Sequence, residues 1–149
     1  MRNKRTIRLY IDTNVLVNYC TCQKNDVDAL NYIFSKRRKE VLFTSSLALA
    51  QTAATLQSGR KTRKKFTKDE VYHYFDKFLR KISVIEVSGN DILSAKSANG
   101  NDVEDNIHYI LSKKVKCDAI VTNNIKDFSS FDNIMTIPPF LSFVKSEIV

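Results

Sequence analysis

Four aspartates stand where an open parallel sheet would bring them together. Asp12 directly follows the first apolar strand, Asp102 and Asp105 open a late helix, and Asp127 comes just after a late strand. Ligands of such sheets bind at the carboxyl ends of the strands. Carboxylates gathered there repel one another unless a cation holds them, and Mg²⁺ or Mn²⁺ prefers an all-oxygen shell. The pattern favours a metal-dependent hydrolase that acts on phosphodiesters.

Each of these acids also has a purely structural interpretation. An acid after a strand can cap the next helix, and Thr13 and Asn14 can share that task with Asp12. Asp102 is as good an N-cap as it is a site residue, and acids in a first turn interact favourably with the helix dipole. For Asp105 the role of a site residue is favoured over that of a cap, because one capping acid already suffices for the helix.

Apolar periodicity predicts strands that alternate with helices. Strands are predicted over residues 8–11, 40–44, 82–87, 118–121 and 135–137. Helices are predicted over 14–19, 26–39, 47–56, 88–99 and 102–113, with another beginning at the capping-box pattern of 67–70 and a C-terminal one after 138–139. Such alternation indicates an α/β fold, with a mostly parallel sheet of four or five strands covered on both faces, in a single domain over 1–149.

Two helices have apolar stripes that we expect to face the core. The helix from residue 67 carries Val71, Tyr74, Phe75, Phe78 and Leu79 on one side. The helix over 102–113 carries Val103, Ile107, Ile110 and Leu111. At about 100° per residue, Asp102, Asp105 and Tyr109 fall on a different face of the second helix.

The composition is that of a globular protein, with 149 residues of which 43% are hydrophobic. No apolar run approaches the roughly 18 residues that a membrane span needs. Three cysteines, an odd number, argue against a secreted disulfide scaffold, so we expect a cytoplasmic protein. Cys20 and Cys22 fit free thiols better than a soft-metal pair, because no second pair or nearby His completes a zinc set.

The charge is strongly basic and clustered. Lys and Arg number 24 against 16 Asp and Glu, which gives a net charge of +8. Basic runs occupy residues 36–39 and 60–65. A single run is usually a solvated face, but two runs on a chain whose acids gather elsewhere favour attraction to polyanions. Phosphate binding through them would be sequence-independent and sensitive to salt.

Four blocks of this sequence, in order, resemble the PIN domain family. They are Ile11-Asp12-Thr13-Asn14-Val15-Leu16, then residues 44–51, 102–106 and 120–128, within a resemblance that covers about 8–143. It implies a three-layer α/β/α fold and Mg²⁺- or Mn²⁺-dependent cleavage of RNA. Many bacterial single-domain members, the VapC-type toxins, are held inactive by a small antitoxin and are often dimers. We therefore expect an RNA substrate, an antitoxin partner and a homodimer.

The resemblance also suggests roles for individual residues. Asp12 matches the family's first metal-binding acid, and Asp105 matches its acid at the start of the late helix. Asn14 matches the polar residue that supports the first acid. Asp102 or Asp127 would complete the metal site.

Two positions depart from the usual family pattern. Gln51 stands where the family usually has a Glu on the third helix, and Asn124 stands where the last block often has an acid. The nearby acid is Asp127, as in another branch of the family. A subgroup with an amide on the third helix resembles this chain most.

The implied mechanism is metal-assisted attack on a phosphodiester. Ser46 and Thr122 are candidates to touch phosphate or metal-bound water. His73 and His108 are expected to be partly exposed bystanders rather than general bases. Arg60, Lys61, Arg63, Lys64 and Lys65 are expected to form a rim that faces RNA or a partner.

Two other functions compete with the nuclease. A catalytically weakened PIN domain would bind RNA or an antitoxin without cutting, which Gln51 and Asn124 motivate. A receiver-like or nucleotide-binding domain is the second rival, but the sequence has no Gly-rich phosphate loop and no paired acid at the end of the first strand.

Overall fold

The strands form one parallel sheet with the first strand at its centre. The structure is a computed structural model, and it describes residues 6–35, 41–61 and 63–137. In spatial order the strands are β3 (Ser83–Ile85), β2 (Val41–Ser45), β1 (Arg8–Ile11), β4 (Ala119–Val121) and β5 (Ile134–Met135). Every neighbouring pair is parallel. The predicted parallel sheet is confirmed.

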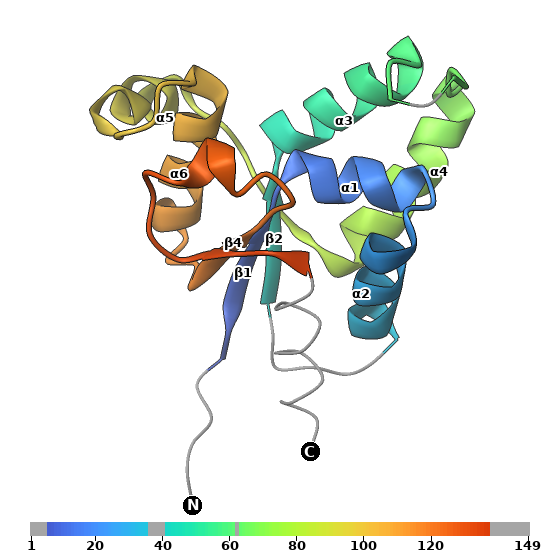
Figure 1. Cartoon of the computed structure of the whole chain (residues 1–149), viewed down its shortest axis with the longest axis horizontal. Coiled ribbons are helices and arrows are strands. Elements are labelled where there is room, and N and C mark those ends of the chain that lie inside the picture. Colours follow the sequence, from blue (N-terminus) through green and yellow to red (C-terminus); the bar gives the residue numbers. More distant parts are fainter. Residues whose placement is uncertain (1–5, 36–40, 62, 138–149) are drawn as a thin grey trace, which may run out of the picture.

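Helices cover both faces of this sheet. They are α1 (Thr13–Cys20), α2 (Lys24–Phe34), α3 (Ser46–Ser58), α4 (Lys68–Lys81), α5 (Gly89–Ser94) and α6 (Val103–Lys114), with short 3-10 turns η1 (Ala95–Ser97) and η2 (Lys126–Phe128). Figure 1 shows α5 and α6 on one side of the sheet and α1 to α4 on the other. The predicted three-layer α/β/α sandwich is therefore confirmed.

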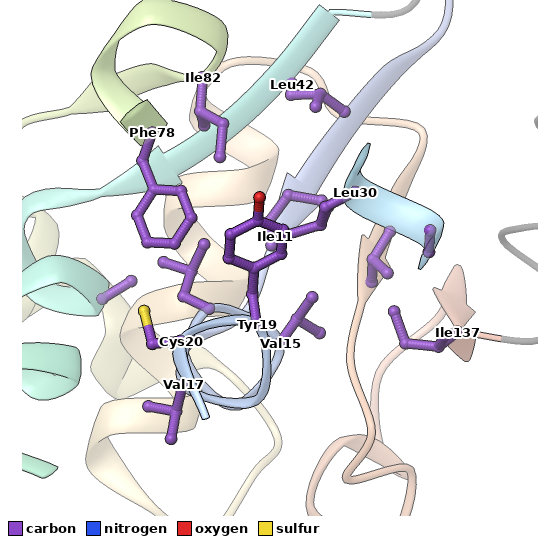
Figure 2. Close-up of a cluster of buried hydrophobic side chains, with 14 of the residues drawn as sticks. Ile11, Val15, Val17, Tyr19, Cys20, Leu30, Leu42, Phe78, Ile82 and Ile137 are labelled. Carbon is purple, nitrogen blue, oxygen red and sulfur yellow. The ribbon is translucent and has the colours of Figure 1, made fainter. Parts of the chain in front are cut away.

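Alternation along the strands divides the apolar core into two halves. Leu9 and Ile11 point to the side of α1 to α4, whereas Tyr10 points to the side of α5 and α6. Figure 2 shows the first half, where Tyr19 and Phe78 pack near Ile11. Because the central strand is buried on both faces, its register is fixed, and so is the place where it ends.

Local sequence determines where the helices begin. Ser45 caps α3, since its Oγ accepts from the Ala48 N–H at 3.0 Å. The predicted capping box at 67–70 is present, with Thr67 and Glu70 each accepting from the other's backbone N–H. Gly59 ends α3 with φ 69°, a left-handed conformation that glycine adopts without strain.

Two expected core residues are in fact exposed. Val103 is 65% exposed because it is the first residue of α6, at the end of the helix that reaches the rim of the sheet. Leu79 is 54% exposed because the buried side of α4 is centred on Val71 and Phe78, and residue 79 lies about 100° round from Phe78. In both cases the predicted apolar stripe includes a residue that lies beyond the part of the helix packed against the rest of the protein.

Several predicted boundaries move. The helix predicted over 26–39 spans Lys24–Phe34, and the strand predicted over 82–87 spans Ser83–Ile85. The last strand spans Ile134–Met135 rather than 135–137. The basic run at 36–39 and the C-terminal helix expected after 138–139 lie outside the described residues.

A close contact fixes the entry to α6. Asn106, in the first turns of this helix, donates from Nδ2 to the Gly100 carbonyl at 2.9 Å. A Cβ on Gly100 would overlap Asn106 Oδ1 and lie 2.8 Å from Phe131 Cζ. A side chain at residue 100 would therefore push against the helix that carries Asp105.

We expect Gly100→Ala to destabilise the protein by about 1–3 kcal/mol, the usual cost of overpacking. Chemical denaturation would measure the change in the free energy of unfolding. Gly89→Ala is the matched control, because a Cβ there meets nothing within 4 Å. Equal stability of the two variants would show that the contact at Gly100 relaxes without cost.

Candidate active site

The site is built around a buried carboxylate at the end of β1. Asp12 is only 5% exposed, and its Oδ1 accepts from the Thr13 N–H at 2.7 Å. Its Oδ2 accepts from Asn14 Nδ2 and from the Thr122 hydroxyl, each at 2.8 Å. The Asn14 amide also donates to Thr122 Oγ1 at 3.0 Å. Asn14 and Thr122 thus hold Asp12 in one orientation. The resemblance implied this role for Asn14, whereas Thr122, a candidate to touch phosphate or metal-bound water, is fully buried and does not line the pocket described below.

An open pocket of about 330 Å³ lies above this carboxylate. It is lined by Asp12, Thr13, Asn14, Val17, Gln51, Ala54, Thr55, Lys61, Glu104, Asp105, His108 and Asn124. Six of the residues singled out in the sequence for the site or its rim therefore come together, from five separate parts of the chain. Glu104, which the sequence analysis left out, joins them.

Three other candidates lie elsewhere. Asp102 is exposed and caps α6, because its Oδ1 accepts from the Asp105 N–H at 2.9 Å. Asp127 is exposed on η2 and does not line the pocket. Ser46 accepts from the Val87 N–H at 3.1 Å, and so it ties α3 to the segment after β3 instead of reaching the pocket. The expectation that Ser46 touches the site is wrong.

The largest error of the sequence analysis concerns His108. It is 2% exposed, not a partly exposed bystander, and its Nε2 lies 3.8 Å from Asp12 Oδ1. Its Nδ1 lies 2.6 Å from the Tyr10 hydroxyl and its Nε2 lies 2.9 Å from Gln51 Oε1. Residues three apart on a helix are neighbours, so its spacing from Asp105 was the available signal.

The hydrogen bonds of His108 determine its protonation. An amide oxygen only accepts, so the Nε2 that faces Gln51 Oε1 carries a hydrogen. The Nδ1 of a neutral ring then carries no hydrogen, and it faces the Tyr10 hydroxyl, which also lies 2.8 Å from Ser45 Oγ. Burial lowers the pKa of His108, an effect that the Asp12 carboxylate opposes in part. The imidazole is therefore neutral near pH 7.

A family comparison identifies the fold that carries this pocket. Residues 8–126 match the family model described as PIN domain. This chain belongs to the PIN domain family. The resemblance found in the four sequence blocks is confirmed. Among curated proteins, no sequence matches the chain significantly.

Solved structures resemble this PIN domain over most of its length. A chain of VapBC2 from Rickettsia felis bound to promoter DNA has a TM-score of 0.59 and 21% identity, with 87% of this chain and 97% of that chain covered. A toxin–antitoxin complex from Klebsiella pneumoniae has a TM-score of 0.59 and 16% identity, with the same coverage of both chains. VapC20 of Mycobacterium tuberculosis, a Sarcin-Ricin loop cleaving toxin, has a TM-score of 0.55 and 13% identity. The match covers 75% of this chain and 86% of that chain. At these identities the likeness shows the fold alone.

Burial and neighbouring carboxylates strongly perturb the pKa of Asp105, which is half-buried. Burial is the main cause that raises the pKa of Asp105 to about 7. Repulsion from nearby carboxylates adds to it, in the order Asp102, Asp12, Asp127 and Glu104. Asp102 and Asp127 thus act on the site through their charge although neither lines the pocket. This PIN domain concentrates negative charge at the carboxyl edge of its sheet.

The donor set of the pocket suits a hard divalent cation. The carboxylates of Asp12, Glu104 and Asp105 and the amide of Asn124 all offer oxygen, the ligand that Mg²⁺ and Mn²⁺ prefer. Within residues 6–35, 41–61 and 63–137, no three His, Cys, Asp or Glu side chains already converge as a ready metal site. The fit therefore rests on donor chemistry and on the uncompensated charge around Asp105.

The basic residues at 60–65 are not equivalent. Lys61 lines the acid pocket. Lys64 points elsewhere, because its Nζ lies 2.6 Å from Glu70 Oε2 and 5.1 Å from the centre of the Phe66 ring. Arg60, Arg63 and Lys65 are exposed outside the pocket. Of the five basic residues predicted to form the rim, only Lys61 therefore lines the site.

A second, larger pocket of about 540 Å³ lies between α1 and α4. Cys20, Cys22 and His73 line it, and both cysteines are free thiols, as predicted. It contains neither Asp12 nor Asp105, and we do not place the chemistry there. None of the described helices is both long enough and apolar enough to cross a membrane.

We expect Asp105→Asn to stabilise the protein at pH 8 and to lose this advantage towards pH 4. A carboxyl whose pKa is raised in the folded state opposes folding once it is charged. The penalty is absent below the ordinary value of 3.8 and complete above about 7. Thermal melts in the absence of divalent metal should show a gain of roughly 2–4 °C at pH 8, allowing for solvent screening.

Asp132→Asn is the control for this experiment, because Asp132 is exposed, does not line the pocket and is not among the acids that raise the pKa of Asp105. Its melting temperature should follow that of the wild type at both pH values. A gain from Asp105→Asn that is as large at pH 4 as at pH 8 would contradict the electrostatic explanation.

Proposed function

We propose that this PIN domain is a metal-dependent endoribonuclease that uses Mg²⁺ or Mn²⁺. The observation that carries the proposal is the meeting of Asp12 and Asp105 in one pocket, where burial and then repulsion from neighbouring carboxylates raise the pKa of Asp105. A divalent cation would relieve that repulsion. The structural likeness to VapC20, described as a Sarcin-Ricin loop cleaving toxin, supports RNA as the substrate class.

Asp12, Asp105 and Glu104 would hold the cation. When bound, the cation would acidify water and neutralise charge that builds up on the scissile phosphate. Asn14 and Thr122 keep Asp12 in its fixed orientation, which is the positioning that such catalysis requires. Lys61, which also lines the pocket, would contact the phosphate.

We further propose that the protein is a cytoplasmic toxin of a toxin–antitoxin pair, bound by a small antitoxin and assembled as a homodimer. The likeness to the toxin–antitoxin complex of Klebsiella pneumoniae supports this assignment. The net charge of +8 suits both a nucleic acid and an acidic partner. Co-purification with the product of a neighbouring small gene, followed by measurement of mass in solution, tests the pairing and the dimer together.

A catalytically weakened module that binds RNA or antitoxin is the second candidate. Gln51 favours it, because an amide stands where the family usually has an acid. A wild-type protein that binds RNA but cuts only after Gln51→Glu would establish this alternative. Cleavage by the wild type would exclude it.

We expect Asp12→Asn and Asp105→Asn each to lower RNA cleavage at least about a hundredfold, the usual scale for losing a group that stabilises transition-state charge. Cleavage of a labelled structured RNA with Mn²⁺, and with EDTA as the blank, measures the effect. Asp132→Asn should retain wild-type activity. Undiminished cleavage by Asp12→Asn would refute the proposed site.

We expect Lys61→Gln to weaken RNA binding and to reduce the slope of log K against log[salt] by about 0.7, the value for one phosphate contact to a single strand. Lys116→Gln is the control, because Lys116 follows α6 at the opposite edge of the sheet. Binding titrations at several salt concentrations in EDTA measure both slopes. Equal slopes for the two variants would remove Lys61 from the RNA-binding surface.

A further inference from the structure

One hydrogen bond crosses the pocket and joins helices from the two outer layers. Gln51 Nε2, on α3, donates to Glu104 Oε2, on α6, at 2.6 Å. The two residues are 53 positions apart in the sequence, and both line the acid pocket. A short bond from an amide to a carboxylate is charge-assisted and therefore stronger than a bond between neutral groups.

Two hydrogen bonds to its oxygen fix the orientation of the Gln51 amide. Its Oε1 accepts from the Thr13 hydroxyl at 2.6 Å and from His108 Nε2 at 2.9 Å. Rotating the amide by half a turn would place Oε1 against the Glu104 carboxylate, and two acceptors would then face each other. His108 is itself held by the buried Tyr10 hydroxyl. The N–H groups of Gln51 consequently point towards Glu104.

We propose that Gln51 is a positioning residue that holds Glu104 as the third carboxylate of the acid pocket. The inference rests on the proposed metal-dependent function. It adds to that function which residue supplies the negative charge that an amide at position 51 cannot supply. Position 51 lacks the acid that is usual on this helix, and the neighbouring acid is supplied by α6 instead. The negative charge at this side of the pocket is thereby kept, on Glu104 rather than on residue 51.

Mn²⁺ affinity measured by calorimetry on the full chain, without RNA, tests the proposal. Glu104→Gln removes the charge but keeps the size and an acceptor for the Gln51 amide. We expect it to weaken Mn²⁺ binding about 10-fold to 100-fold with little change in the melting temperature in EDTA. Glu86→Gln, an exposed acid outside the pocket, should bind Mn²⁺ as the wild type does.

A double-mutant cycle then asks whether Gln51 acts through Glu104. Gln51→Ala should weaken Mn²⁺ binding about tenfold, and Gln51→Ala with Glu104→Gln should be no weaker than Glu104→Gln alone. Fully additive losses would overturn the positioning role. If Gln51 only tied α3 to α6, its variant would lower the melting temperature and leave Mn²⁺ affinity unchanged, which would also overturn it.

The same titrations separate this inference from the proposed function. Glu104→Gln that binds Mn²⁺ like Glu86→Gln, while Asp12→Asn abolishes binding, would overturn the role of Glu104 and leave the nuclease proposal standing. A wild type that binds no Mn²⁺ and cuts no RNA would overturn both.

Discussion

The site depends on the buried carboxylate of Asp12 having every donor that it needs. A charged group removed from water is costly unless hydrogen bonds replace its hydration. The Thr13 N–H, the Asn14 amide and the Thr122 hydroxyl supply those bonds, and they come from α1 and from the end of β4. Because the Asp12 N–H donates to the Val121 carbonyl at 3.0 Å, the parallel pairing of β1 with β4 continues to the acid itself. The register of the sheet therefore determines where the carboxylate lies.

Charge is distributed unevenly over this PIN domain. The net charge of the chain is +8, but several of its acids gather around Asp105, whose pKa is raised first by burial and then by these acids. The two features act at different ranges. The net charge attracts a polyanion from a distance and weakens with salt, whereas the local acids would repel its phosphates at contact. A cation in the pocket, with Lys61 beside it, would resolve this conflict.

Much of the fold could be predicted because it follows from local patterns. Apolar runs that end in polar residues marked the strands, and the capping box at 67–70 marked the start of α4. Asp12 was found by the same reasoning, since the carboxyl ends of parallel strands meet at one edge. The exposures of Val103 and Leu79 could not be predicted in this way, because they depend on how far each helix extends beyond the sheet.

The parts of the site that escaped prediction are those set by contacts between distant residues. Ser45 and Ser46 are equivalent in sequence as helix caps, yet Ser45 turns inward to Tyr10 at 2.8 Å and Ser46 turns to Val87. From the sequence, Glu104 is an ordinary acid in the first turn of a helix. The hydrogen bond from Gln51 distinguishes it from other such acids. His108 was missed because its partners, Tyr10 and Gln51, lie on other elements.

The amide at position 51 also explains how a histidine can be buried beside Asp12. Tyr10, His108 and Gln51 form a chain of hydrogen bonds in which every member is neutral, so Asp12 is the one charged group of this buried cluster. A carboxylate at residue 51 would attract a proton to the imidazole and bury an ion pair, whose desolvation penalty can exceed its Coulombic gain. With an amide, the negative charge stays on Glu104 at the exposed side of the pocket, where a cation or a phosphate-bound cation can reach it. The amide at residue 51 thus leaves the negative charge on Glu104, while the network of Tyr10, His108 and Gln51 stays neutral and hydrogen-bonded.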